Sequence, residues 1–461
     1  MTESAPDDLN TLYTRIDDAA GAIAEDVTAW RHHLHKNPEL SNREVETEQF
    51  IVERLEEFGI TDISQGIAGH GVVARIAGGR SENGFGEDDR SENCESSENS
   101  RTILLRADID ALPVKEKSGE DFASEKVDKD YPGGPFPVAH ACGHDTHTAM
   151  LLGAAKILHD IREELRGDVQ LVFQPAEEGP PPGEDGGASL MVEEMEQRGM
   201  FDPAPTMAFG IHITPMPVGA IGYARGIQHA ASETVKITIE GKQVHGSTPW
   251  LGVDPMPAVG DILSNIGQIY RQVDVQERFS ISLGHIVDEG RFNIVGNKVE
   301  IWGTVRALRP EVMSDVNERI ERYVTHTAAA HGCTGVVEFL DQIPAVAHTQ
   351  EWIDAIMPTY RRVAGDKPVI EVPPAMGYDD VSEFTSRFGG VYGLLGGQNI
   401  AFTEDGGITP TNGDDRGFAA NHSPQFYVND DALTYGVRLH AHVAVNHLLG
   451  EVDDGEGQPR S

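Results

Sequence analysis

Six side chains of the sequence offer the thiolate, imidazole and carboxylate groups that bind divalent metals: Cys142, His144, Glu177, Glu178, His212 and His422. The first two flank a glycine in the run VAHACGHDTHTAM, just before a helical pattern. This mixture of ligands suits Zn²⁺, Mn²⁺, Co²⁺ or Ni²⁺ better than Mg²⁺ or Ca²⁺. The set therefore predicts a metal site, provided that the fold brings these distant segments together.

Three apolar runs supply the strands that could do this: ILLRADID, VQLVFQPAEE and TMAFGIHI. Helical segments, TAMLLGAAKILHDI and one around SLMVEEMEQRGM, follow the first two, which predicts an α/β sheet of buried, parallel-type strands. The first run ends in Asp108 and Asp110, the second in Glu177 and Glu178, and the third in His212. Because ligands collect outside the carboxyl ends of such strands, we expect these side chains at one edge of the sheet.

Helices and an insertion fill the sequence before these strands. One amphipathic helix is expected up to the Asn37–Pro38 breaker, and a second from about Arg43 to Phe58. Residues 78–100 are polar and contain RSEN twice, so they are expected to form a solvated, mobile insertion between two strands. Cys94, inside this segment, is given no functional role.

The length of 461 residues and a change of pattern predict two domains. Residues 231–344 contain alternating strands, ETVKITIEG and NKVEIWGTVRAL, with helices between and after them, and are expected to form an inserted α+β domain. Residues 1–230 and 345–461 would then be the two parts of a discontinuous α/β domain.

Composition narrows the class of protein. The formal net charge is −39, from 75 acidic and 36 basic residues, which makes nucleic acid an unsuitable partner and resembles proteins of salt-loving archaea. The first residues lack an apolar signal region and no stretch approaches 18 consecutive apolar residues, so we expect a cytoplasmic protein without a membrane segment. Three cysteines are an odd number and do not indicate a disulfide framework.

Several motifs, in order along nearly the whole chain, resemble one enzyme family: RHHLHKNPEL, LLRADIDALP, HACGHDTHTAMLLGAA, VFQPAEEG, GIHI, HGSTP and NHSPQF. They are similar to the aminoacylase, hippuricase and indole-acetyl-amino-acid hydrolase branch of the dinuclear-metal peptidases. The resemblance implies a zinc-exopeptidase-like catalytic domain that holds two divalent ions, and an inserted domain used for homodimerisation and as a lid. It also implies metal ligands at Cys142, His144, Glu178, His212 and His422, with Glu177 as the catalytic base.

The chemistry of the residues fits these roles. Two divalent ions can polarise an amide carbonyl and lower the pKa of a water molecule. Since Glu177 and Glu178 are adjacent, one can bind metal while the other moves a proton from the water to the leaving amine. Asp108 is expected to orient a ligating imidazole from behind.

The resemblance also implies three substrate-binding residues in the inserted domain: His245, Asn293 and Arg306. The first two would approach the substrate carbonyl, and Arg306 would grip a free carboxylate with paired hydrogen bonds. If the lid is shared between subunits, His245 would serve the active site of the partner.

Other residues of the same types are expected to play structural or supporting parts: His32, His33, His35, His140, His147, Asp110, Asp145 and Cys333. Two stretches depart from the family pattern and could reshape the substrate pocket. The segment GYDDVSEF places Asp379 where relatives show glutamate, and the loop from Gln398 to Ala420 is long and acidic.

The leading hypothesis is hydrolysis of small N-acyl amino acids to a carboxylate and a free amino acid. The runner-up, exopeptidase action on short peptides, needs the same metals and a different pocket. A third hypothesis is a cysteine hydrolase with Cys142 as nucleophile and His144 or His140 as base. Metal-dependent binding without turnover is the alternative in which the chain is not an enzyme.

Overall fold

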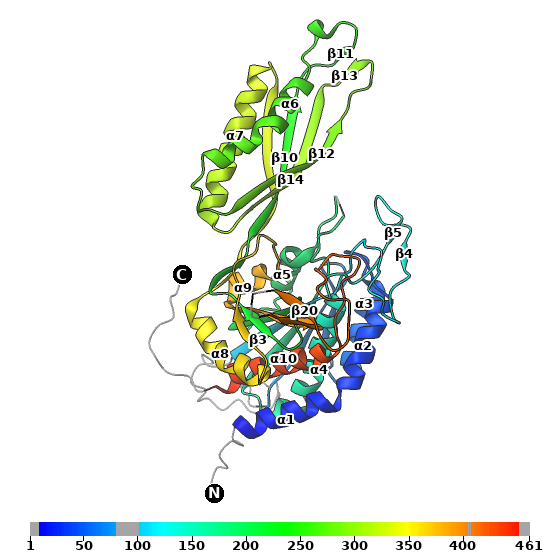
Figure 1. Cartoon of the computed structure of the whole chain (residues 1–461), viewed down its shortest axis with the longest axis vertical. Helices are drawn as coiled ribbons and strands as arrows, with labels where there is room; N and C mark the ends of the chain where they lie inside the picture. Colours follow the sequence, from blue (N-terminus) through cyan, green and yellow to red (C-terminus); the bar gives the residue numbers. More distant parts are fainter. Residues whose placement is uncertain (1–8, 80–100, 182, 404, 406, 451–461) are drawn as a thin grey trace. The chain divides into compact units, whose positions relative to one another are not determined.

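The computed structural model describes residues 9–79, 101–181, 183–403, 405 and 407–450, and the chain divides into two compact units. The first unit comprises Met1–Arg225, His348–Val372 and Glu383–Ser461, and the second comprises Gly226–Ala347 and Pro373–Ser382. Nearly all of the expected insertion 78–100, Cys94 included, lies outside the described residues. Figure 1 draws both units and labels those elements for which there is room.

An eight-stranded mixed sheet, in the order β1-β2-β6-β3-β7-β18-β8-β17, forms the centre of the first unit. Its strands are β1 (Asp62–Ile67), β2 (Gly71–Ile76), β3 (Arg101–Asp108), β6 (Gly167–Gln174), β7 (Met207–Pro217), β8 (Ile221–Tyr223), β17 (Val369–Glu371) and β18 (Gly390–Gln398). The four central strands, from β6 to β18, run parallel to one another, and β2 joins them antiparallel. The expected α/β class is confirmed, and its parallel strands are the apolar runs of the sequence.

Helices cover both faces of this sheet, which explains why its central strands are apolar throughout. The helices are α1 (Leu9–Ala22), α2 (Ala24–Lys36), α3 (Val45–Glu57), α4 (His144–Asp160), α5 (Gly187–Gln197), α8 (Gln350–Ala364), α9 (Ser382–Phe388) and α10 (Asp431–Leu449). Ile103 and Leu105 of β3 share a core with α4 and α10, whereas Leu104 packs in another core with Met191 of α5 and Phe384 of α9. Successive β3 side chains therefore point to opposite helical layers.

Shorter strands complete the first unit and its loops. They are β4 (Val127–Asp128), β5 (Phe136–Pro137), β19 (Ile400–Phe402) and β20 (Ile408–Pro410). The last two pair as a hairpin inside the loop 398–420 that departs from the family pattern. The expected opening helix is two helices, α1 and α2, that meet at Ile23.

The second unit is an antiparallel four-stranded sheet in the order β12-β14-β10-β15, with helices α6 and α7 packed in its core. Its elements are β9 (Gly226–His229), β10 (Ala231–Glu240), β11 (Val244–His245), α6 (Met256–Asn265), β12 (Phe279–Asp288), β13 (Ile294–Val295), β14 (Lys298–Ala307), α7 (Pro310–Ala330) and β15 (Thr334–Ile343), followed at the boundary between the units by β16 (Val346–His348). Every second side chain of β10 from Val235 to Ile239 points into the core, so Val235, Ile237 and Ile239 are buried there.

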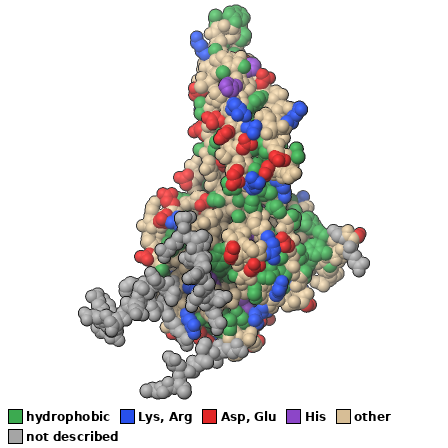
Figure 2. All heavy atoms as spheres, turned by 90° about the vertical axis from the view of Figure 1, so that its left-hand side faces the viewer, with side chains coloured by type: hydrophobic (Ala, Val, Ile, Leu, Met, Phe, Trp, Pro, Cys, Tyr) green, Lys and Arg blue, Asp and Glu red, His purple; other side chains and the backbone are tan. Residues whose placement is uncertain are grey.

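No helix within the described ranges is long and apolar enough to cross a membrane. Acidic side chains are spread over the face drawn in Figure 2 and lie among lysines and arginines.

Candidate metal centre

A sharp turn before α4 presents Cys142 and His144 from neighbouring positions. Gly143, the residue before the helix, has a φ of 93°, which a residue with a side chain rarely adopts. A Cβ atom at this position would lie 2.2 Å from Cγ2 of Ile213, so only glycine fits against β7. The sequence Cys-Gly-His thus lets the thiol and the imidazole emerge from one tight turn.

The other ligand segments reach the same place through similarly constrained backbone. Ala176 has a φ of 53° just before the two glutamates, and its N–H donates to Oε1 of the buried Glu44 at 2.9 Å. His422 has a φ of 66°, and its N–H donates to the carbonyl of Ala141 at 2.7 Å. Left-handed backbone at residues other than glycine is uncommon and clusters at functional sites.

Cys142 stands between two histidines from distant parts of the chain. Its Sγ lies 3.4 Å from Nε2 of His212 and 3.3 Å from Nε2 of His422. The same His422 nitrogen is 3.1 Å from Oε1 of Glu178. His144 extends the group, with Nε2 at 3.7 Å from Glu177 and 3.9 Å from Glu178.

All five sequence-predicted ligands and Glu177 therefore meet within the first unit. They form three overlapping groups of possible ligand atoms: Cys142, His144 and His212; Cys142, Glu178 and His422; and His144, Glu177 and Glu178. In each group the ligand atoms lie within 4.8 Å of one another. Since Cys142, His144 and Glu178 each belong to two groups, the arrangement can accommodate neighbouring ions.

Hydrogen bonds behind the imidazoles fix which nitrogen faces the centre. His212 donates from Nδ1 to the carbonyl of Ile213 at 2.6 Å, so the lone pair of Nε2 points to Cys142. His144 donates from Nδ1 to Oδ1 of Asp110 at 3.1 Å. Its Nε2 is buried and has no hydrogen-bond partner among the described residues. A buried polar atom without a partner is costly, and a metal ion would satisfy it.

His147 is excluded as a ligand by its own hydrogen bonds. Its Nε2 accepts from the backbone N–H of Ile213 at 2.8 Å, which leaves Nδ1–H to donate to Asp108. Both ring nitrogens are therefore used.

The two aspartates after β3 have different tasks. Orientation of a ligating imidazole, which we expected of Asp108, falls to Asp110 instead. Oδ2 of Asp110 also accepts from Ser41 and from the N–H of Glu178, so this residue connects two ligand segments. Asp108 binds His147 and lies 3.8 Å from Nε2 of His144. The difference arises because Asp108 is the last residue of β3, whereas Asp110 lies in the segment that follows the strand.

Arg106 is a supporting residue that the sequence analysis missed. It is almost fully buried and donates to Asp108 at 2.6 Å and to Gln174 at 2.8 Å. Burial alone would raise the pKa of Asp108, but the nearby His144, His147 and Arg106 outweigh it and hold that pKa well below its usual range. An arginine inside the apolar run ILLRADID was the available signal, because a buried arginine requires a partner.

A second network holds the start of α4 from outside. Asp145 accepts from Arg31 at 2.9 Å and from His35 at 2.8 Å, and His35 also contacts Glu116. Burial lowers the pKa of His35, but Asp145 outweighs burial and raises it to about 9. His32 contacts Asp430, so neither of these two histidines faces the metal centre through a described contact.

His212 lies inside β7, which differs from the expectation that it ends a strand. The pairing of β7 with β3 extends only to Gly210, opposite Arg106. The strand continues because β18 pairs with it through Pro217, with Leu394 opposite His212. His212 is therefore beyond the end of the neighbouring ladder, where its side chain can reach Cys142.

The three predicted substrate residues lie in the second unit. His245 in β11 pairs with Ile294 of β13, and the carbonyl of Asn293 accepts from Gly246, so His245 and Asn293 are close. Both side chains are exposed. Arg306 lies in β14 opposite Ser232, donates to the carbonyl of Met376 at 3.2 Å and covers the ring of Tyr378.

Replacement of Asp110 by asparagine should weaken metal binding by about 10- to 100-fold, the usual effect of losing a group that orients a ligand. An amide would remove the negative charge behind His144 and could place a donor against the N–H of Glu178. Metal content and competition with a chromophoric chelator measure the change. Asp121→Asn, at an exposed aspartate of the same unit, is the control, and equal affinity in the two variants would contradict the assignment.

Metal binding at pH 7 should release about two protons per chain. Burial lowers the pKa of His144, but Asp108 and Asp110 outweigh it and raise it to about 10, so the ion-free imidazole is protonated. Burial and then Glu178 raise the pKa of the Cys142 thiol, which is also protonated. Affinity should therefore increase with pH as proton competition declines.

Calorimetry in buffers of different ionisation enthalpy counts these protons. Cys142→Ser should lower the count by about one, because a serine hydroxyl would stay protonated. A binding enthalpy that does not depend on the buffer would disagree with this scheme.

Comparison with known proteins agrees with the geometry. The model of peptidase family M20/M25/M40 matches residues 104–446. The chain is 33% identical to thermostable carboxypeptidase 2 of Saccharolobus solfataricus, over 90% of this chain and 93% of that protein. It is 36% identical to an N-acyl-L-amino acid amidohydrolase of Geobacillus stearothermophilus, over 68% of this chain and 75% of that one.

A solved structure extends the likeness to the fold. It is a Bacillus subtilis protein described as a dinuclear metal binding peptidase, with a TM-score of 0.68 and 27% identity over 93% of this chain and 99% of that one. The resemblance of the sequence motifs is thereby confirmed. With its thiol, imidazole and carboxylate ligands gathered at the carboxyl edge of an α/β sheet, the chain belongs to peptidase family M20/M25/M40, whose members are metal-dependent amide hydrolases.

Proposed function

We propose that the chain hydrolyses the amide bond of small N-acyl amino acids and holds two divalent ions, of Mn²⁺, Zn²⁺, Co²⁺ or Ni²⁺. The observation that carries the proposal is a second carboxylate beside the ligand set: Glu177, next to the ligand Glu178, comes within 3.7 Å of Nε2 of His144. Overlapping ligand groups support two ions, as does the dinuclear Bacillus subtilis relative. The Geobacillus relative supports the substrate class.

The residues then divide the work of the reaction. When bound, the ions polarise the scissile carbonyl and lower the pKa of a water molecule. Glu177 accepts the proton of that water and delivers it to the nitrogen of the leaving amine. Asp110 and the carbonyl of Ile213 hold His144 and His212 in the tautomers that ligation needs. Arg106 keeps Asp108 ionised behind them.

The thiol environment weighs against the cysteine hydrolase. Burial, followed by the carboxylates of Glu178 and Glu177, raises the pKa of Cys142, whereas a nucleophilic cysteine needs a lowered pKa. His140 is no better suited as its base, because burial lowers the pKa of His140 to about 4.

The runner-up is exopeptidase action on short peptides, which the Saccharolobus carboxypeptidase supports. The substrates of both reactions carry a free carboxylate, and Arg306 is the group proposed to bind it. Its guanidinium lies 5.0 Å from the centre of the Tyr378 ring, within the GYDDVSEF departure. A change in this segment would therefore act on the carboxylate site and on selectivity between substrates.

A panel of N-acetyl, benzoyl and indole-acyl amino acids and of dipeptides tests the proposal, with release of free amino acid as the readout. Chelator should abolish activity and added metal should restore it. Glu177→Gln should retain metal and lower turnover by about 10²- to 10⁴-fold, the contribution typical of a general base. Cys142→Ser should bind metal more weakly and lose activity accordingly. Activity that resists chelator and is blocked by a thiol reagent would favour the cysteine mechanism.

We further propose that the second unit forms a homodimer and supplies His245 to the site of the partner subunit. Arg306 is opposite Ser232 at one end of β10, while His245 follows the other end at Glu240. Eight residues of strand separate these ends by about 26 Å, too far for one small substrate. If both residues bind substrate at one centre, they must come from different chains.

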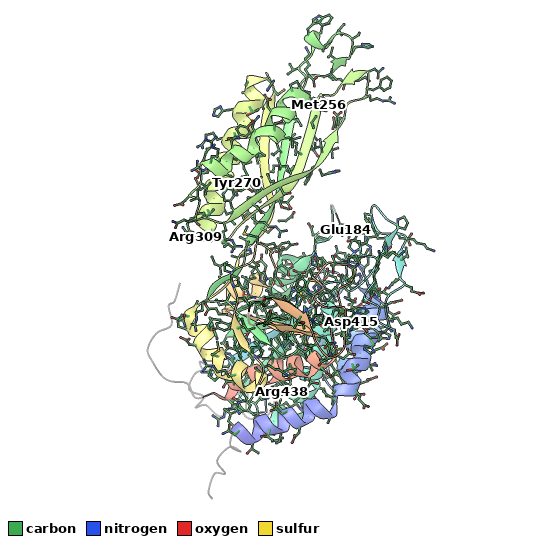
Figure 3. The ribbon with its side chains drawn as sticks, viewed as in Figure 1. Glu184, Met256, Tyr270, Arg309, Asp415 and Arg438 are labelled. Carbon is green, nitrogen blue, oxygen red and sulfur yellow. The ribbon has the colours of Figure 1, made fainter. Side chains whose placement is uncertain are left out.

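The surface of the second unit also fits an interface. The strand β12 is at an edge of the sheet and exposes Ile286 and Val287. Phe292 is fully exposed, and Met256 and Tyr270, labelled in Figure 3, are nearly half exposed. Unpaired edges and apolar surface of this kind are normally covered by a partner.

Complementation tests the shared site. Glu177→Gln and His245→Ala should each be nearly inactive as homodimers. When the two chains are co-expressed, half of the dimers are mixed and each contains one intact site, so activity should return to about one quarter of wild type. Double-tag purification isolates the mixed dimer, which should reach half. A mixed dimer as inactive as its parents would show that each chain supplies its own His245.

Two features of the composition stay as predictions. The net charge of −39 favours a protein that needs concentrated salt to screen its own repulsion, so the substrate panel is to be run in molar KCl. A location in the cytoplasm is also proposed, because three cysteines are an odd number and fit a reducing compartment.

A further inference from the structure

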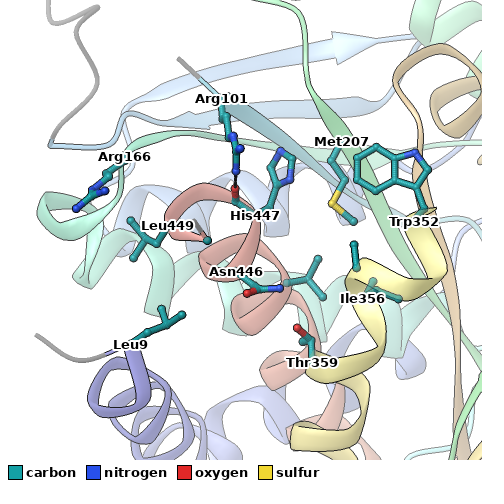
Figure 4. A pocket seen from close by; sticks show the side chains of 13 residues that line it. Leu9, Arg101, Arg166, Met207, Trp352, Ile356, Thr359, Asn446, His447 and Leu449 are labelled. Carbon is teal, nitrogen blue, oxygen red and sulfur yellow. Dashed lines mark hydrogen bonds between the residues drawn. The ribbon is translucent and has the colours of Figure 1, made fainter. Parts of the chain in front are cut away.

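A pocket lies in the first unit, at the amino ends of β3 and β7. Its volume is about 700 Å³, within the range of small-molecule sites. Figure 4 shows its lining, with Arg166 and Trp352 on opposite sides. Arg101 begins β3, whereas Asp108, beside the metal centre, ends it. Seven residues of strand therefore separate the pocket from that centre by roughly 23 Å.

The charge of this pocket is opposite to that of the chain. Within the described part of the chain, Arg101 and Arg166 are the only Lys, Arg, Asp or Glu side chains in its lining, although the whole chain carries a net charge of −39. Arg166 is exposed and forms no ion pair with a described residue. Arg101 donates to the carbonyl of His447 at 2.7 Å, near the end of α10. A helix end carries only about half a negative charge, so two guanidinium groups make the lining formed by the described residues positive.

The rest of the lining is mainly apolar. Trp352 and Ile356 of α8 face Leu9 and Leu449 around the cavity, and Met207 lies beside Trp352. His447 lies 2.7 Å from the hydroxyl of Thr206. Burial, and then Arg101, lower its pKa to about 4, so His447 is neutral at pH 7 and adds no charge. The cavity thus combines a cationic side with an apolar wall that contains an aromatic ring.

We propose that this pocket binds an amphipathic organic carboxylate, with the carboxylate on Arg101 and Arg166 and an acyl chain or aromatic ring against Trp352 and Ile356. Guanidinium groups recognise carboxylates, and a wall of this kind buries the apolar part. Such a ligand could be an acyl amino acid of the class proposed as substrate or a fatty acid. The binding site does not depend on which reaction the metal centre performs.

Calorimetric titration with hippurate and, separately, with decanoate tests the proposal. The full-length, metal-loaded Glu177→Gln protein is used as the background for all variants, because it should retain metal while hydrolysing hippurate far more slowly. Arg166→Gln should weaken pocket binding by about tenfold, the value of one charge-assisted contact. Ala355→Trp would fill the cavity from an exposed position on α8 and should abolish binding of the ligand in the pocket. Arg361→Gln is the control, because it removes one positive charge from α8 outside the pocket and Arg361 is exposed.

The two ligands distinguish the source. Variant-sensitive binding of hippurate supports a site for the acyl amino acid, and variant-sensitive binding of decanoate supports a site for fatty acid. Binding of hippurate at the metal centre would persist in both variants and so is separated from the pocket. The proposal is overturned if neither ligand binds, or if both bind Arg166→Gln and Ala355→Trp as tightly as they bind Arg361→Gln.

Discussion

Convergence of carboxylates is the constraint on which the rest of the first unit depends. Four carboxylates meet in the interior: those of Asp108, Asp110, Glu177 and Glu178. The first three are buried, and Glu178 is partly exposed. Two like charges at 4 Å repel by about 4 kcal/mol at the effective dielectric near a protein surface. Arg106, Ser41 and the backbone of the ligand segments stabilise the two aspartates. His144 and His422 lie beside the two glutamates, and the divalent ions that the family uses would balance their charge.

The backbone accepts strain to achieve this convergence. Left-handed residues at Gly143, Ala176 and His422 turn three separate segments inward. Each turn is fixed by a contact from a distant part of the chain: Ile213 against Gly143, Glu44 on Ala176 and Ala141 on His422. Two helical layers pack on the sheet beneath and supply the stability that holds such a geometry.

The two ends of the parallel sheet carry side chains of opposite charge, and we assign a binding site to each. The carboxyl end gathers carboxylates and attracts cations, whereas the amino end carries two arginines in an otherwise acidic chain. The two ends of the sheet in the second unit also carry different groups, because the ten-residue strand β10 keeps His245 apart from Arg306. Strand length, more than residue type, decides which groups can act on one molecule.

The sequence by itself determined the α/β class, the metal-binding character and the family, because these depend on apolar runs and short motifs that are local in the chain. It supplied every residue of the three overlapping ligand groups. It assigned ligation to His144 and a supporting part to His147 only with the help of the family resemblance. It did not separate the task of Asp108 from that of Asp110, since the two are close in sequence and differ in the distant atoms they contact. Tertiary structure decided those roles through Ile213, Ser41 and Arg106. It also decided the position of His212 within β7 and the pocket around Arg101, because strand register and cavities arise only when segments far apart in the chain pack together.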